Sequence, residues 1–154
     1  MNKQNMNRQS GFTLIEVLVA VLVLALGLLG LAGLQANAVK TNHSALQRSQ
    51  AVMLAYFMMD AMRANKAVAG AGSYNLGTPG TPDAPVCDAP TESDLVTHDQ
   101  AHWFAALKEN LGDAPTTCGL IACDASANCT VKVFWDDSRA GGSSAQTIEI
   151  TSRL

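Results

Sequence analysis

Glu16 is the residue whose chemistry fits its surroundings least. It lies near the start of "GFTLIEVLVAVLVLALGLLGLAGL", in which residues 17–34 carry neither a charge nor a polar side chain. An apolar run of that length approaches what a helix needs to cross a bilayer, and residues 12–15 extend it. An ionisable side chain in such a segment is costly unless it is paired, so it marks a functional position. The sequence therefore predicts that the Glu16 carboxylate meets a cation.

Three kinds of N-terminal segment could contain this apolar run. An ordinary secretory signal peptide would be cut after "ANA" at 36–38, but its apolar region is typically shorter than this one and lacks an acid. A plain membrane anchor explains the length and leaves Glu16 unexplained. A cut after Gly11, on the cytoplasmic side, would keep the apolar segment on the mature protein. It would also create an α-ammonium group at Phe12, which is the cation that Glu16 requires.

The residues around Gly11 favour this third explanation. The string "SGFTLIEVLVA" closely resembles the class III signal of type IV pilins and type II secretion pseudopilins. The resemblance implies that residues 1–11 are a basic leader, which a prepilin peptidase removes between Gly11 and Phe12. Phe12 then becomes the N-methylated terminus, and Glu16 becomes the fifth mature residue. Glu16 could face its own N-terminus or that of a neighbouring subunit, and the resemblance implies the neighbour.

Further strings narrow the resemblance to one group of subunits. "VLALGLLGLAGLQ", "WFAAL", "TVKVFWDD" and the terminal "TSRL" resemble the PilV-like minor pilins, the type IV pilus modification proteins. By this resemblance the chain is a structural subunit that waits in the inner membrane with a periplasmic head and is assembled into the extracellular pilus. Its implied partners are prepilin peptidase, other minor pilins, the major pilin and a tip adhesin, in a complex that primes or caps the pilus for twitching motility and adhesion. A minor pseudopilin of a type II secretion system is the alternative, and an anchored periplasmic binding module or enzyme is a third.

The apolar segment contains three glycines at three-residue steps, Gly27, Gly30 and Gly33. Gly33 stands where the helix of major pilins commonly has a proline. Small residues let membrane helices pack closely, and each glycine weakens a helix by up to about 1 kcal/mol relative to alanine. Two roles therefore stay open, namely close packing and a segment that extends when the subunit leaves the lipid.

The order of the remaining patterns predicts an α+β, type IV pilin-like fold, in which a long N-terminal helix packs on a small C-terminal antiparallel sheet. We expect a leader over 1–11, a transmembrane and assembly helix over 12–34, and an amphipathic continuation of that helix over 35–69. A Gly/Pro-rich αβ-loop over 70–92 and a head over 93–154 follow. The head is expected to contain one short helix and three strands, because "CGLIAC", "CTVKVFWDD" and "QTIEITSRL" read as strands and the latter two alternate with a period of two.

Two helical faces in this region are expected to be buried. The continuation helix lacks proline and glycine and ends at Gly70 and Gly72. Its apolar stripe is predicted at Leu46, Met53, Phe57, Ala61, Ala64 and Val68. The short helix is predicted over 93–111, with an inner face of Leu95, Trp103, Leu107 and Leu111.

Four cysteines follow the apolar segment, an even number that in an exported domain predicts two disulfides. If "DASAN" turns a hairpin, Cys123 faces Cys129 across it, and a bond between them is within reach. Cys118 then lies opposite Phe134, too far along the strand to reach Cys129. This register predicts Cys123–Cys129 and, by elimination, Cys87–Cys118.

The other polar residues argue against catalysis and metal binding. His98 and His102 are four residues apart, a spacing that can bind metal, but no third ligand accompanies them. Asp124, Asp136 and Asp137 could supply oxygen ligands, yet aspartates in turns usually cap or are solvated. From residue 70 onward four Lys/Arg stand against eleven Asp/Glu, and such an acidic head argues against nucleic-acid binding. We therefore expect no cofactor, no metal and no catalytic residues.

Overall fold

The computed structural model describes residues 11–154, so the predicted leader lies outside the described residues except for Gly11. Residues 11–154 form three α-helices, three strands and a short 3-10 helix. In chain order these are α1 (Leu14–Ala64), α2 (Lys66–Gly70), α3 (Leu95–Leu111), β1 (Cys118–Cys123), β2 (Asn128–Trp135), η1 (Ser138–Ala140) and β3 (Gln146–Arg153). Two compact units meet inside α1, between Val39 and Lys40. We call them the apolar unit and the head.

In the described residues of the apolar unit, 11–39, every residue is exposed. Helix α1 begins at Leu14, and its most apolar 18-residue window has a mean hydropathy of 2.9 with none of it buried. A helix of that length and composition is able to cross a membrane. The helix is continuous through the three glycines.

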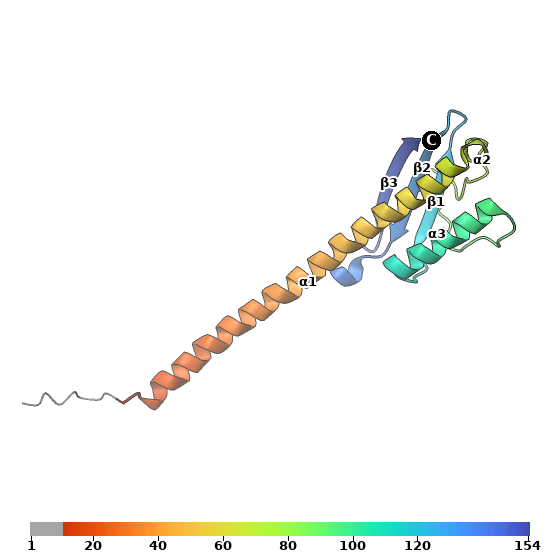
Figure 1. Ribbon diagram of the computed structural model, residues 1–154. Coiled ribbons are helices and arrows are strands. Elements are labelled where there is room, and N and C mark those ends of the chain that lie inside the picture. Colours follow the sequence, from red (N-terminus) through yellow and green to blue (C-terminus); the bar gives the residue numbers. More distant parts are fainter. Residues whose placement is uncertain (1–10) are drawn as a thin grey trace, which may run out of the picture. The chain divides into compact units, whose positions relative to one another are not determined.

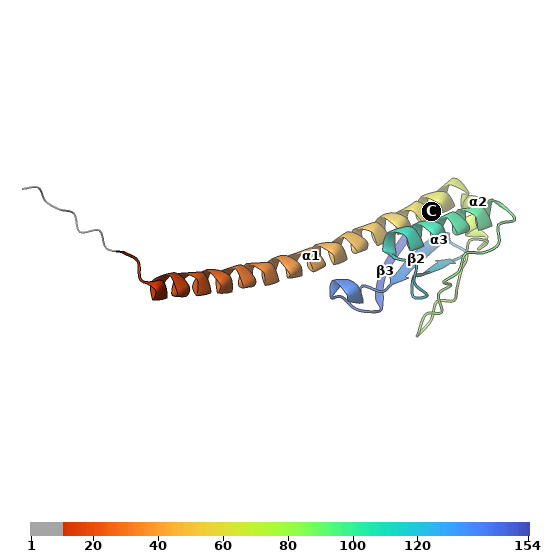
Figure 2. The ribbon, with the colours of Figure 1, turned by 90° about the horizontal axis from the view of Figure 1, so that it is seen from below.

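The head is built on a three-stranded antiparallel sheet in the order β1-β2-β3. The second half of α1 and helix α3 run beside this sheet in both Figure 1 and Figure 2. Their buried residues share one hydrophobic core with the inward face of β2, which alternates along the strand as period-two patterning requires. The predicted fold class, a long N-terminal helix packed on a small antiparallel sheet, is confirmed.

The hairpin register is also confirmed. Cys123 pairs with Cys129, Ile121 with Val131, and Cys118 with Phe134. The residues between the strands make the turn, where Ala127 has a φ of 59°. Disulfides join Cys123 to Cys129 and Cys87 to Cys118, the same pairs that the register favours.

The buried face of α1 differs from the predicted stripe. Leu46, Met53, Phe57 and Ala64 are exposed, whereas Ala61 and Val68 pack against the core as predicted. The fully buried residues of α1 are Ala51, Ala55, Met58, Met59 and Met62. Apolar side chains occupy both faces of this stretch, so periodicity alone selected the wrong face at most positions. The two alanines let the helix approach the core closely while three methionines fill the irregular space. Helix α1 also ends at Ala64, and α2 continues to Gly70 after a break at Asn65.

Helix α3 begins two residues later than predicted, and its inner face differs at one position. Asp94 is the N-cap: its carboxylate accepts the Thr97 N–H at 2.8 Å, and the Thr97 hydroxyl accepts the Asp94 N–H at 3.0 Å. Leu95 is 61 % exposed, so its assignment to the inner face was wrong. The buried stripe runs through Val96, Gln100, Trp103, Phe104, Leu107 and Leu111. Leu95 stands one residue before that stripe begins.

The long loop between α2 and α3 is held along the free edge of β1. Leu76 pairs with Ile121 and Val86 with Gly119 as isolated bridges, next to the Cys87–Cys118 disulfide. Near its tip, the Asp83 carboxylate accepts from Lys132 Nζ at 2.9 Å. These contacts make the loop part of the head's structure despite its Gly/Pro-rich sequence.

Candidate processing and assembly site

The peptide bond between Gly11 and Phe12 lies outside regular secondary structure, just before α1. Gly11 is exposed, and a Cβ atom added to it would meet nothing within 4 Å. Phe12 is 83 % exposed. The chain's own packing therefore does not require a glycine here, and both residues are accessible to an enzyme that acts on the backbone.

Thr13 directly precedes the first residue of α1. Its carbonyl oxygen accepts from the Glu16 N–H at 3.1 Å and from the Val17 N–H at 3.4 Å, which places Thr13 at the N-cap position. Threonine at the N-cap with glutamate three residues later is the capping-box pattern. This pattern is present in the sequence but was not predicted, because the charge of Glu16 in an apolar run drew attention away from its place three residues after a threonine.

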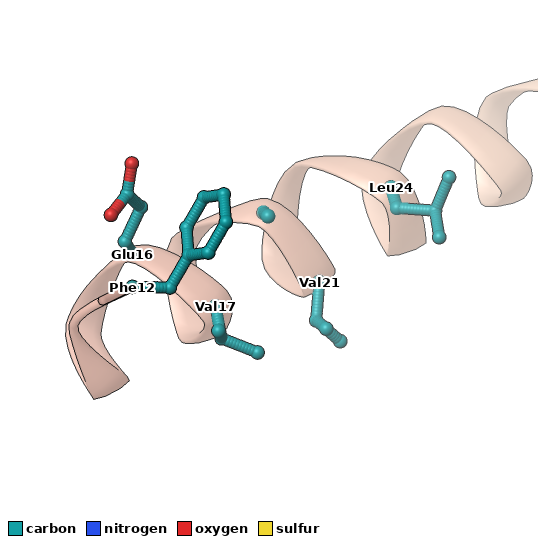
Figure 3. A pocket seen from close by; sticks show the side chains of 6 residues that line it. Phe12, Glu16, Val17, Val21 and Leu24 are labelled. Atoms are coloured by element: carbon teal, nitrogen blue, oxygen red, sulfur yellow. The ribbon is translucent and has the colours of Figure 1, made fainter. Parts of the chain in front are cut away.

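The Glu16 carboxylate lies at one end of an otherwise apolar groove. Phe12, Val17, Ala20, Val21 and Leu24 line the rest of it. Figure 3 shows the Glu16 carboxylate projecting from the first turn beside the Phe12 ring, while Val17, Val21 and Leu24 project from a neighbouring side of the helix. The groove therefore presents one carboxylate and, beside it, an apolar surface.

Two forms of electrostatic stabilisation are open to Glu16. Acidic residues in the first helical turn are favoured by the helix dipole, and Glu16 occupies that turn. Within residues 11–154, the ion pairs formed by side chains all lie in the head, so none of them involves Glu16. Glu16 is exposed, so its carboxylate is accessible from outside the chain.

The three glycines of the apolar unit have open space around them. A Cβ atom added at Gly27, Gly30 or Gly33 would meet nothing within 4 Å. Contacts inside the chain therefore do not explain why these positions lack side chains. Any packing role would involve lipid or another polypeptide.

Of the three aspartates considered as oxygen ligands, Asp124 and Asp136 accept hydrogen bonds that hold turns. Asp124 accepts from the N–H groups of Ser126 and Asn128 at 2.8 and 2.9 Å and from Asn128 Nδ2 at 2.9 Å, and these bonds lower its pKa. Asp136 accepts from the Ser138 N–H at 2.8 Å, which lowers its pKa likewise. Asp137 is buried and accepts from the Ser44 hydroxyl. Over residues 11–154, no three or more His, Cys, Asp or Glu side chains are grouped so that they could hold a metal ion.

Comparison with known proteins identifies the N-terminal segment. Residues 6–32 match the family model described as the prokaryotic N-terminal methylation motif, which is the class III signal of type IV pilins. The match includes Gly11, Phe12 and Glu16, and it ends before Gly33 and the whole head. No curated protein and no solved structure matches the chain.

Proposed function

We propose, from the premise that this chain carries the class III signal of type IV pilins, that it is a minor pilin: a structural subunit that helps to prime or cap a type IV pilus. The match at residues 6–32 carries the proposal and supports a pilin or pseudopilin. A long helix on a small antiparallel sheet, with two disulfides, is consistent with the pilin fold.

Processing is the first step of the proposed function. A prepilin peptidase cuts between Gly11 and Phe12, and the new α-amino group of Phe12 is methylated. The exposure of both residues and their position outside the helix support this step. The amine stays protonatable after methylation, so the mature chain carries a cation at the end of its apolar helix.

Glu16 then acts as the partner of that cation. In the apolar layer of a filament both charges are expensive unless they pair, so the pair selects the subunit register as well as stabilising it. We assign the cation to the N-terminus of a neighbouring subunit. The apolar groove beside Glu16 provides the surface on which that neighbour's first residues would pack.

The minor-pilin role rests on the strings in the head and apolar segment that resemble this group. Before assembly the apolar unit would hold the subunit in the inner membrane, with the head in the periplasm. Other minor pilins, the major pilin and a tip adhesin are the proposed partners. A minor pseudopilin is the second candidate, because the methylation motif is shared with that class.

The intact mass of the mature protein tests processing. We expect a chain that begins at N-methylated Phe12. When the prepilin peptidase is inactivated, the measured mass should increase by that of residues 1–11, and the methyl group on Phe12 should be absent. A mature chain beginning at Val39 would contradict the proposal and establish an ordinary signal peptide.

Substitution of Glu16 tests assembly and separates the pairing of its charge from the capping of the helix. Glu16→Gln keeps a side chain able to cap the helix but removes the charge. If charge pairing matters, Glu16→Ala and Glu16→Gln should both reduce recovery in sheared filaments by about 10-fold or more, since breaking one partner of a buried ion pair costs about 3–5 kcal/mol. Glu109→Gln, on the exposed surface of α3, is the matched control. Normal incorporation of Glu16→Gln would show that capping suffices.

Deletion of the gene separates the pilus from the secretion system. Loss of surface pili and twitching motility with normal exoprotein release would support the minor pilin. Loss of exoprotein release with normal twitching would replace it with the pseudopilin.

A further inference from the structure

Two histidines lie one turn apart on the exposed side of α3. The ring centroids of His98 and His102 are 5.8 Å apart and the rings are tilted by 59°. Both residues are exposed, and both belong to a helix whose first turn is closed by the Asp94–Thr97 capping box. The backbone that carries the two rings is therefore well ordered.

Glu92 orients the first of these rings. Its Oε2 lies 2.8 Å from His98 Nδ1. With the neutral imidazole donating its Nδ1–H to this carboxylate, the lone pair stands on Nε2, on the opposite side of the ring. Histidines that bind metals nearly always donate their other N–H to a carboxylate, carbonyl or water, which sets the ring orientation and raises the basicity of the ligand atom.

We propose that His98 and His102 bind one divalent first-row transition metal ion, such as Ni²⁺, Cu²⁺ or Zn²⁺, with Glu92 as the positioning residue of His98. Imidazole suits these metals. At metal–nitrogen distances of about 2.0–2.1 Å, two imidazoles at a tetrahedral or cis angle on one metal have ring centroids about 4.5–5.2 Å apart. The observed 5.8 Å is slightly longer, so a small rotation of these exposed side chains brings both rings onto one ion.

The site supplies two protein ligands, and water or an outside ligand completes the coordination. A closed structural site usually has four protein ligands, so a site with two is an open one on the surface. The site belongs to the head and does not depend on the proposed role in a pilus. Its failure and the failure of that role are therefore distinguishable.

Calorimetric titration of the full chain with Ni²⁺, in detergent micelles and without a polyhistidine tag, tests the site. We expect one ion per chain, with affinity lowered about 10-fold or more in His98→Asn and in His102→Asn. His43→Asn, which changes an exposed histidine on α1, is the matched control and should bind like the parent. Because the rings of His98 and His102 are exposed, neither variant should alter the circular dichroism spectrum. A titration of the parent without saturation, or a variant at His98 or His102 that binds as tightly as the parent, would overturn the proposal.

Glu92→Gln tests the positioning role. A carboxylate that merely holds the loop would leave metal affinity unchanged. A residue that orients His98 should lower the affinity about 10-fold when it is replaced. Unchanged affinity in Glu92→Gln would remove Glu92 from the site.

Discussion

The apolar unit and the head use hydrophobic residues in opposite ways. Between Phe12 and Val39, every large apolar side chain is at least 52 % exposed. The head instead has an internal core in which Trp103, Tyr74 and Phe104 are fully buried, although Tyr56 and Phe57 of α1 stay exposed. The two regions are joined within a single helix, so helix formation itself does not cause the difference. It comes from whether the chain supplies its own apolar partners.

Because of this difference, substitutions of apolar residues should have different effects on stability in the two regions. In the head, apolar burial is internal, so a lost contact should lower the free energy of unfolding. In the apolar unit, burial must come from lipid or from other polypeptides, so the same kind of substitution should leave the head's stability unchanged. The predictions below test that separation.

Trp103→Ala should have the largest effect on the head. The ring is fully buried, and its Nε1 donates to the Leu54 carbonyl of α1 at 3.0 Å. Large aromatic truncations cost about 3–5 kcal/mol. Denaturant unfolding of the full chain in micelles measures the loss.

Two further variants control this experiment. Trp103→Phe keeps most of the ring and loses the hydrogen bond, so it should cost less than Trp103→Ala. Leu22→Ala removes an exposed apolar side chain from the apolar unit and should leave the head's unfolding curve unchanged. Destabilisation by Leu22→Ala equal to that of Trp103→Ala would refute the separation of the two regions.

The two disulfides should contribute unequally to the head. Cys87–Cys118 spans 31 residues and Cys123–Cys129 spans six. Because the entropy lost by the unfolded chain grows with loop length, removal should cost about 3.5 kcal/mol for the longer loop and about 2 kcal/mol for the shorter. Paired Cys→Ser variants, unfolded in denaturant, give both values. A larger loss from Cys123→Ser with Cys129→Ser would contradict this order.

The sheet of the head was predictable because its sequence pattern is compatible with a single strand pairing. Alternation along "TVKVFW" assigns one face of β2, and the "DASAN" turn then sets the register that places Cys123 opposite Cys129. The buried face of α1 was not predictable in this way, since Phe57 and Met58 are adjacent and both apolar. Only the packing of the sheet shows that Met58 is inside.

The contacts of polar residues in the core were likewise hard to predict from the sequence. Gln100 lies on the buried stripe of α3 because its Nε2 donates to the Tyr74 carbonyl at 3.0 Å, a partner 26 positions earlier that no local pattern reveals. Gly11, Phe12 and Glu16 were found from a short contiguous motif. The contact between Glu92 and His98 depends on the path of the loop before α3. It therefore could not be predicted from the sequence that a carboxylate orients His98.

Glycine-to-alanine substitution should have opposite signs in the two regions. Gly119 lies against the Trp103 ring, and an added Cβ would collide with that ring. Gly119→Ala should therefore destabilise the head by about 1–3 kcal/mol. Gly30→Ala meets only open space and should strengthen the helix by up to about 1 kcal/mol.

Hydrogen exchange measures the second effect. Amides of α1 around residue 30 should exchange about 5-fold more slowly in Gly30→Ala, in line with a gain of about 1 kcal/mol. The filament assay then distinguishes the two roles left open for these glycines. Normal extraction from the membrane with poor packing in filaments would indicate close packing, whereas impaired extraction would indicate a segment that must extend.

Acidification should weaken the head through its paired carboxylates, and this is the smallest effect we expect. Hydrogen bonds from Lys132 Nζ and from the Gly80 N–H lower the pKa of Asp83 below its ordinary value of 3.8. A group with a lowered pKa in the folded state stabilises the fold above its unfolded pKa and loses that contribution as pH falls through the folded value. The stability of the parent should therefore decline below about pH 4.

Asp83→Asn isolates this contribution. At pH 7 the variant should be less stable than the parent, and the two denaturation midpoints should converge as pH falls below about 4, because protonation removes the same charge. Asp88→Asn changes a carboxylate that is 94 % exposed and lies 3.6 Å from Lys108 Nζ, and because such exposed pairs contribute little, it should stay close to the parent at every pH. If the difference between Asp83→Asn and the parent stayed constant down to pH 2, the ion pair with Lys132 would not be its cause. Glu16 is the only acidic residue before Lys40, so the pH dependence measured in this way reports on the head.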